Sequence, residues 1–161
     1  METLMKHTKE SNFIPNDLIW KDGLLFCTQC KEYLKESEFS ANASNNKYRN
    51  FRRTICRKCY NKNQHENVKN YTDAQKLRKC LNVRLLGARD RAKNNNLYFD
   101  LTLDFLLKLW NSQKGLCALS NVPMTFELLN GRTPSNVSID KIDHNGGYSK
   151  DNVQLVCMEC N

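Results

Sequence analysis

Two Cys-x-x-Cys pairs in the N-terminal half of the chain are spaced to bind a metal. Cys27 and Cys30 form the first pair, Cys56 and Cys59 form the second, and 25 residues separate the two pairs. Each pair turns two thiolates toward one point, and two such turns complete the tetrahedral shell that Zn²⁺ prefers. A disulfide pair is disfavoured in a reducing compartment, and a redox centre needs one such motif rather than two. The spacing therefore predicts a structural zinc site.

A second group of candidate ligands lies near the C-terminal end of the chain. Asp140, Asp143 and His144 follow one short segment of alternating apolar and polar residues, and Asn161 follows another. Carboxylate, imidazole and amide side chains together suit a hard divalent cation such as Mg²⁺. If the two segments pair, these side chains come close enough to share an ion.

The positive charge of the chain is concentrated in one block. Between Lys47 and Lys93 there are 15 basic residues and 3 acidic ones, so this block carries +12 while the whole chain carries +8. The remainder is therefore acidic, at −4. Such a block favours a polyanion partner, DNA above all. A solvated helix face that keeps the protein soluble is the alternative interpretation.

The candidate residues need helices and strands to position them. A helix is predicted from about Thr72 to the run of asparagines at 94–96, because apolar residues recur there at helical spacing: Leu77, Leu81, Leu85 and Ala88. A second helix is predicted from the N-cap Thr102, with a buried stripe of Leu103, Leu106, Leu107 and Trp110. Alternation at 137–139 and 153–157 predicts two short strands joined by a Gly-Gly loop.

Length and composition limit the class of protein. A chain of 161 residues accommodates one or two small modules and excludes a large multidomain enzyme. No apolar stretch is long enough to cross a bilayer, so no membrane association is expected, and the N-terminus does not resemble a signal peptide. We therefore expect a protein that is not secreted and that acts inside the cell, in the cytoplasm or in the nucleoid or nucleus of a host.

The C-terminal residues resemble the HNH nucleases, the ββα-metal group, and especially the phage type related to recombination endonuclease VII. The resemblance is carried by the segments 138–148 (SIDKIDHNGGY) and 151–161 (DNVQLVCMECN), with 115–124 (GLCALSNVPM) ahead of them. It extends loosely from residue 27, because members of the group often place a cysteine ribbon and a basic helix before this core. The specific part is the last 47 residues.

The resemblance implies roles for three residues of the core. Asp140 corresponds to the metal-binding aspartate, Asn161 to the second metal ligand, and Asn152 to the asparagine that orients the base. The implied cofactor is Mg²⁺ or Mn²⁺, which in this reaction stabilises the leaving 3′-oxygen and the pentavalent phosphate while a base activates water. The implied substrate is DNA, and a homodimer is compatible with an enzyme that cuts both strands.

The sequence departs from the family at the general base. Lys141 occupies the position where the family has its catalytic histidine. An ordinary lysine is protonated at neutral pH and cannot accept a proton from water. The role of base is therefore expected to pass to Asp143 or His144.

The resemblance also implies a second zinc knuckle. Its ligands would be Cys117, Cys157 and Cys160, with Ser120 at the position of the fourth cysteine. Three thiolates with water or a hydroxyl make one interpretation, and an empty knuckle packed as core makes the other. A further departure is that family members continue past the asparagine into a helix, whereas this sequence stops at Asn161, as a truncated form or a degenerate nuclease would.

Together these observations predict a small α+β protein of four parts. These are an N-terminal arm (1–22), a zinc-ribbon-like module (23–70), a basic helical segment (71–112) and an HNH-like ββα-metal core with its final helix truncated (113–161). The first functional hypothesis is a metal-dependent HNH endonuclease that hydrolyses DNA phosphodiester bonds. The alternative is a non-catalytic zinc-ribbon nucleic-acid-binding protein with a degenerate nuclease core. An adaptor that binds protein would leave the basic block unexplained.

Overall fold

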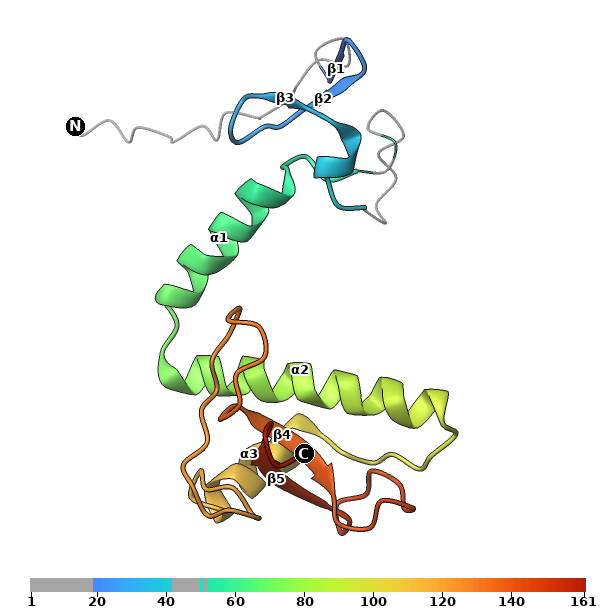
Figure 1. Cartoon of the computed structure of the whole chain (residues 1–161), viewed down its shortest axis with the longest axis vertical. Helices are drawn as coiled ribbons and strands as arrows, with labels where there is room; N and C mark the ends of the chain where they lie inside the picture. The colour runs from blue at the N-terminus through green and yellow to red at the C-terminus, as the bar shows by residue number, and fades with distance from the viewer. Residues whose placement is uncertain (1–18, 42–49, 51) are drawn as a thin grey trace, which may run out of the picture. The chain divides into compact units, whose positions relative to one another are not determined.

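The computed structural model describes residues 19–41, 50 and 52–161, and their contacts form two compact units. The division lies between Glu66 and Asn67, and we call the two parts the N-terminal and C-terminal units. In the described residues, three α-helices and two small sheets give the expected α+β composition (Figure 1). Most of the predicted N-terminal arm and two of the basic residues, Lys47 and Arg49, lie outside the described residues.

The N-terminal unit is built on a small antiparallel sheet. The strands β1 (Trp20–Lys21), β2 (Leu24–Phe26) and β3 (Tyr33–Leu34) pair in the order β1-β2-β3, and a 3₁₀ turn follows at Glu36–Glu38. The structure thus includes residues 20 and 21 in this sheet, although the sequence suggested no element for them. The core is small, and its buried members are Ile19, Leu25, Cys27, Phe39, Cys56 and Cys59.

The helix α1 (Arg57–Lys69) begins directly after Cys56 and continues across the division between the units. It has one buried residue, Cys59, and a polar sequence otherwise. Apolar periodicity therefore gave no sign of it, and the sequence analysis did not predict a helix here. Its place in the N-terminal unit is explained by Cys59, which lies in its first turn.

The C-terminal unit contains the elements that the sequence predicted. The helix α2 (Asp73–Asn94) begins with a capping box between Thr72 and Gln75, and α3 (Leu103–Ser112) is capped by the Thr102 side chain. The strands β4 (Val137–Lys141) and β5 (Val153–Cys157) form an antiparallel pair. The predictions of two helices, of the N-cap Thr102 and of two short strands are confirmed.

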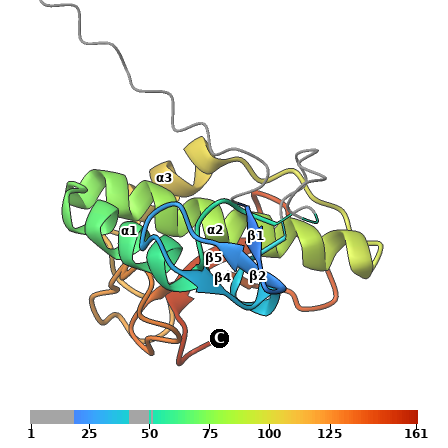
Figure 2. The same cartoon turned by 90° about the horizontal axis from the view of Figure 1, so that it is seen from above.

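The helix α2 packs against both α3 and β4, and α3 also contacts β5 (Figure 2). Apolar side chains from all four elements form one core, whose fully buried members include Leu81, Ala88, Leu106, Val137 and Leu155. Residues 137 and 139 of β4 belong to this core, whereas the C-terminal end of the strand emerges from it. The core thus holds β4 alongside α2 and leaves Asp140 and Lys141 half-buried at the strand end.

In the described part of the chain, none of the helices combines the length and the apolar character that crossing a membrane requires. The longest of them, α2, carries charged residues along its whole length.

Candidate functional site

The four cysteines of the first two pairs meet in the N-terminal unit. Their sulfur atoms all lie within 4.8 Å of one another, and the Sγ atoms of Cys27 and Cys59 are 3.9 Å apart. Cys27 follows β2 directly, and Cys56 and Cys59 lie at the start of α1. The cluster predicted from the spacing is therefore present, and four thiolates at this separation could hold a metal ion such as Zn²⁺.

Backbone amides prepare this cluster for a cation. Burial raises the pKa of the Cys27 thiol, but the N–H groups of Cys56, Cys30 and Gln29 around its sulfur outweigh burial and bring the pKa to about 6. Burial raises the pKa of Cys30 to about 12, and the neighbouring thiols of Cys27 and Cys59 add to the rise. Without a cation the four groups cannot all ionise so close together, and a divalent ion removes that repulsion.

The residues of the implied second knuckle are only partly gathered. Cys117 and Cys157 are close, since the Cys157 N–H donates to the Cys117 sulfur at 3.3 Å, whereas Cys160 is exposed. Within the described residues, the N-terminal cluster alone brings three or more histidine, cysteine or acidic ligands within 4.8 Å. The sulfur atoms of Cys117, Cys157 and Cys160 thus do not all lie within 4.8 Å of one another, unlike those of the four cysteines in the N-terminal unit.

Ser120 makes a hydrogen bond with Cys117 at the knuckle. Burial raises the pKa of the Cys117 thiol, but hydrogen bonds from the Ser120 hydroxyl and from nearby backbone amides outweigh it and bring the pKa to about 6. The turn is closed by backbone bonds from Cys117 N to Val122 O and from Asn121 N to Cys117 O, each 2.9 Å. These hydrogen bonds hold the turn that carries Cys117.

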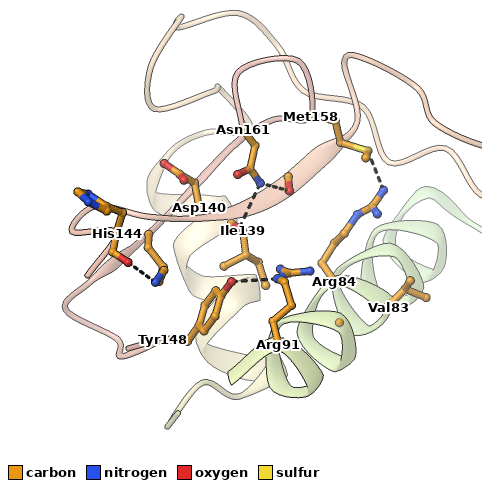
Figure 3. Close-up of a pocket in the computed structure, with 12 residues that line it drawn as sticks. Val83, Arg84, Arg91, Ile139, Asp140, His144, Tyr148, Met158 and Asn161 are labelled. Carbon is orange, nitrogen blue, oxygen red and sulfur yellow. Dashed lines mark hydrogen bonds between the residues drawn. The ribbon is translucent and has the colours of Figure 1, made fainter. Parts of the chain in front are cut away.

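A cavity of about 510 Å³ opens in the C-terminal unit between α2, the end of β4 and the C-terminal turn (Figure 3). It brings together three of the predicted site residues: Asp140, His144 and Asn161. Asp143 and Asn152 are not among the residues that line it. The implied metal-binding pair thus shares one cavity, and His144 is the one of the two candidate bases that reaches it.

Each of the two implied metal ligands, Asp140 and Asn161, is hydrogen-bonded to the protein through one of its side-chain atoms. Gln154, which pairs with Asp140 across the hairpin, donates from Nε2 to Asp140 Oδ2 at 2.9 Å. The Asn161 amide nitrogen donates to Ser138 Oγ and to Ile139 O. Within the part of the chain that the structure describes, no hydrogen bond is shown to the second carboxylate oxygen or to the amide oxygen. Oxygen is the donor that Mg²⁺ and Mn²⁺ take. The residues present therefore fit such an ion.

Asn152 braces the loop between β4 and β5. Its Oδ1 accepts the Asp143 N–H at 2.7 Å, and its Nδ2 donates to the Asp143 and Gly147 carbonyls at 3.0 and 2.9 Å. Asp143 itself is exposed and caps the loop by accepting the Asn145 N–H at 3.0 Å. The asparagine thus positions the backbone that carries His144.

Lys141 acts as a donor in the same loop. Its Nζ donates to the carbonyls of His144 and of Gly146, the latter at 2.9 Å, and lies 5.5 Å from the centre of the Tyr148 ring. An ammonium group that donates to two carbonyls has no lone pair to accept a proton from water. This geometry agrees with the expectation that Lys141 is not the base.

Two arginines of α2 also line the cavity, and the sequence analysis counted them only as part of the basic block. They are Arg84 and Arg91, which are seven residues apart and so lie on one helix face. That spacing was the available signal, but it is also common on solvated helices. The sequence analysis did not predict the bond from Gln154 to Asp140, because that bond depends on how β4 and β5 are paired. The pairing register cannot be read from the sequence.

The comparisons with known proteins do not extend this description. No family model, no curated protein and no solved structure matches the chain.

Proposed function

We propose that the protein is a metal-dependent endonuclease of the HNH type that hydrolyses DNA phosphodiester bonds. The observation that supports this best is the shared cavity, where Asp140 and Asn161 each keep an oxygen for a cation and His144 lies within reach of the same space. The four-cysteine cluster of the N-terminal unit would be a structural zinc site in a DNA-binding module.

In this proposal the residues of the cavity divide the work between charge and proton transfer. Asp140 and Asn161 would hold Mg²⁺ or Mn²⁺, and the bound ion would stabilise negative charge on the phosphate and on the leaving 3′-oxygen. The His144 imidazole would take the proton from the attacking water. Asn152 and Lys141 keep the loop of His144 in place through its backbone.

The test is a plasmid-nicking assay of the full chain with and without Mg²⁺. Asp140→Asn removes the charge that holds the cation, and we expect nicking to fall by at least about 100-fold. Asp151→Asn is the matched control, because Asp151 is exposed and does not line the cavity. Equal loss in both variants, or equal nicking by Asp140→Asn and the parent chain, would contradict the proposal.

One observation favours a second function. Lys141 fills the position of the family's catalytic histidine and is bound to backbone carbonyls, as expected of a nuclease core kept for its fold. The protein would then be a zinc-ribbon nucleic-acid-binding protein without catalysis. In that case the parent chain binds DNA but leaves it intact at any Mg²⁺ or Mn²⁺ concentration, and Asp140→Asn has unchanged DNA affinity.

A further inference from the structure

We infer that Arg84 and Arg91 form a phosphodiester clamp on the α2 wall of the cavity, across from Asp140 and Asn161. Both side chains extend from α2 toward β4 and line the same cavity as the two implied metal ligands (Figure 3). The choice of a nucleic-acid phosphate as occupant rests on the proposed function. The presence of an anion site does not, since it follows from the geometry and charge of the cavity.

Contacts with neighbouring residues fix each guanidinium. Arg84 Nε donates to the Val137 carbonyl at 3.0 Å, and its Nη2 lies 3.2 Å from the Met158 sulfur. Arg91 Nε donates to the Tyr148 hydroxyl at 2.9 Å, and Tyr148 is buried. A guanidinium held in this way loses little further entropy when its remaining N–H groups bind a ligand, so the arrangement is preorganised.

The space between the two arginines is kept open by a glycine. Gly87 lies between them along α2 and also lines the cavity. A Cβ at this position would lie 3.5 Å from Arg91 Nη1, in ordinary contact, and a longer side chain would extend further into the cavity. A glycine in the middle of a helix lowers helix stability by about 1 kcal/mol relative to alanine. The open space at Gly87 therefore comes at a cost in helix stability.

The charge of the cavity favours an anion. Within the described residues, no carboxylate lies within 4.0 Å of either guanidinium, and the ion pairs involve other basic residues. The cavity is lined by the basic side chains of Arg84, Arg91 and Lys141 and by one acidic side chain, that of Asp140. The Lys141 ammonium already donates to carbonyls, which leaves the two planar guanidinium groups as donors. Their geometry matches the oxygens of a phosphate.

The binding test uses inorganic phosphate as the probe and the full chain as the protein. We expect the Nε–H signals of Arg84 and Arg91 in a ¹H–¹⁵N NMR titration to shift and saturate together. The Arg78 signal is the internal control, because Arg78 lies on the same helix outside the cavity, 3.9 Å from Asp104. A linear drift of the same size in all three arginines would overturn the clamp.

The functional test uses two variants that act by different routes. Arg91→Gln removes a charge, whereas Gly87→Leu keeps both arginines, improves helix propensity and fills the space between them. We expect each to abolish the saturable phosphate response and to lower plasmid nicking at least about 10-fold, because Arg91→Gln removes a charge that stabilises the phosphate and Gly87→Leu excludes the phosphate from the space between the arginines. The matched charge control Arg78→Gln should nick within about 2-fold of the parent chain, and thermal unfolding checks that all variants are folded.

The two proposals can fail separately. Saturable phosphate binding by a parent chain that never nicks DNA would contradict the nuclease proposal and support the clamp. Nicking by Arg91→Gln and Gly87→Leu at the parent rate would contradict the clamp and support the nuclease proposal.

Discussion

At the scale of single residues, the loop between β4 and β5 is held by side chains that the HNH resemblance would use for chemistry. Lys141 and Asn152 together bind the backbone of Asp143, His144, Gly146 and Gly147. These bonds fix the position of His144 relative to β4. The candidate base is therefore positioned by its neighbours' side chains rather than by a bond to its own imidazole ring among those the structure shows.

Replacing Lys141 tests this bracing. Lys141→Met keeps the length of the side chain and removes both bonds to carbonyls, so the free energy of unfolding of the C-terminal unit should fall by about 1–2 kcal/mol. Urea unfolding followed by circular dichroism measures the change. Lys150→Met is the control on the same loop, since Lys150 is exposed and the only bond shown for it is from its backbone N–H to Asp100. Equal stability of the two variants would argue against the brace.

Replacing the two candidate bases separates their roles. His144→Ala should lower nicking by about 100-fold or more, the usual contribution of a general base. Asp143→Ala should stay within a few-fold of the parent chain, because Asp143 is exposed and does not line the cavity. The reverse order of effects, measured as initial nicking rates at saturating Mg²⁺, would assign the base to Asp143.

At the scale of elements, the C-terminal unit could be predicted from the sequence and α1 could not. The helices α2 and α3 have apolar residues at helical spacing and a threonine at the N-cap, so a helix and its first residue can be predicted from the sequence in both cases. The polar helix α1 has no stripe, and its buried residue is a cysteine that reads as a metal ligand. Likewise Asp140 and Asn161 could be assigned from a motif, whereas Arg84 gains its place through contacts 53 and 74 residues away.

The capping box of α2 gives a prediction at this scale. Thr72→Ala removes the acceptor for the Gln75 N–H and should lower the free energy of unfolding of the C-terminal unit by about 1 kcal/mol. Thr72→Ser keeps the hydroxyl and should restore most of that loss. Thermal unfolding of the two variants in parallel checks this, and an equal loss in both would mean that the cap does not matter.

At the scale of the whole molecule, the two units differ in what stabilises them. The N-terminal unit has strands of two or three residues and a core in which half of the buried residues are cysteines. The C-terminal unit has a core of sixteen buried residues, drawn from four elements and the segments that connect them, and it has two caps of its own. A small core of the first kind usually needs a metal, while the second can fold without one.

Metal removal should therefore unfold one unit and spare the other. We expect a strong chelator to collapse the NMR signals of residues 19–41 into the unfolded region while those of β4 and β5 stay dispersed. Re-addition of Zn²⁺ should restore them, and Cys56→Ser should show the unfolded pattern before chelation. Chelation that leaves the N-terminal unit folded would contradict a structural role for zinc.

The wide sequence separation of the cavity walls also sets when the site can exist during synthesis. The arginine wall is translated first, but Val137, Tyr148 and Met158, which hold those arginines, follow 53, 57 and 74 residues later. At roughly 5–20 residues per second, a ribosome exposes the leucines of α2 for several seconds before β4 and β5 can cover them. A nascent chain thus exposes apolar surface before its cavity is complete, because the cavity forms only when Met158 and the residues before it have folded back onto α2.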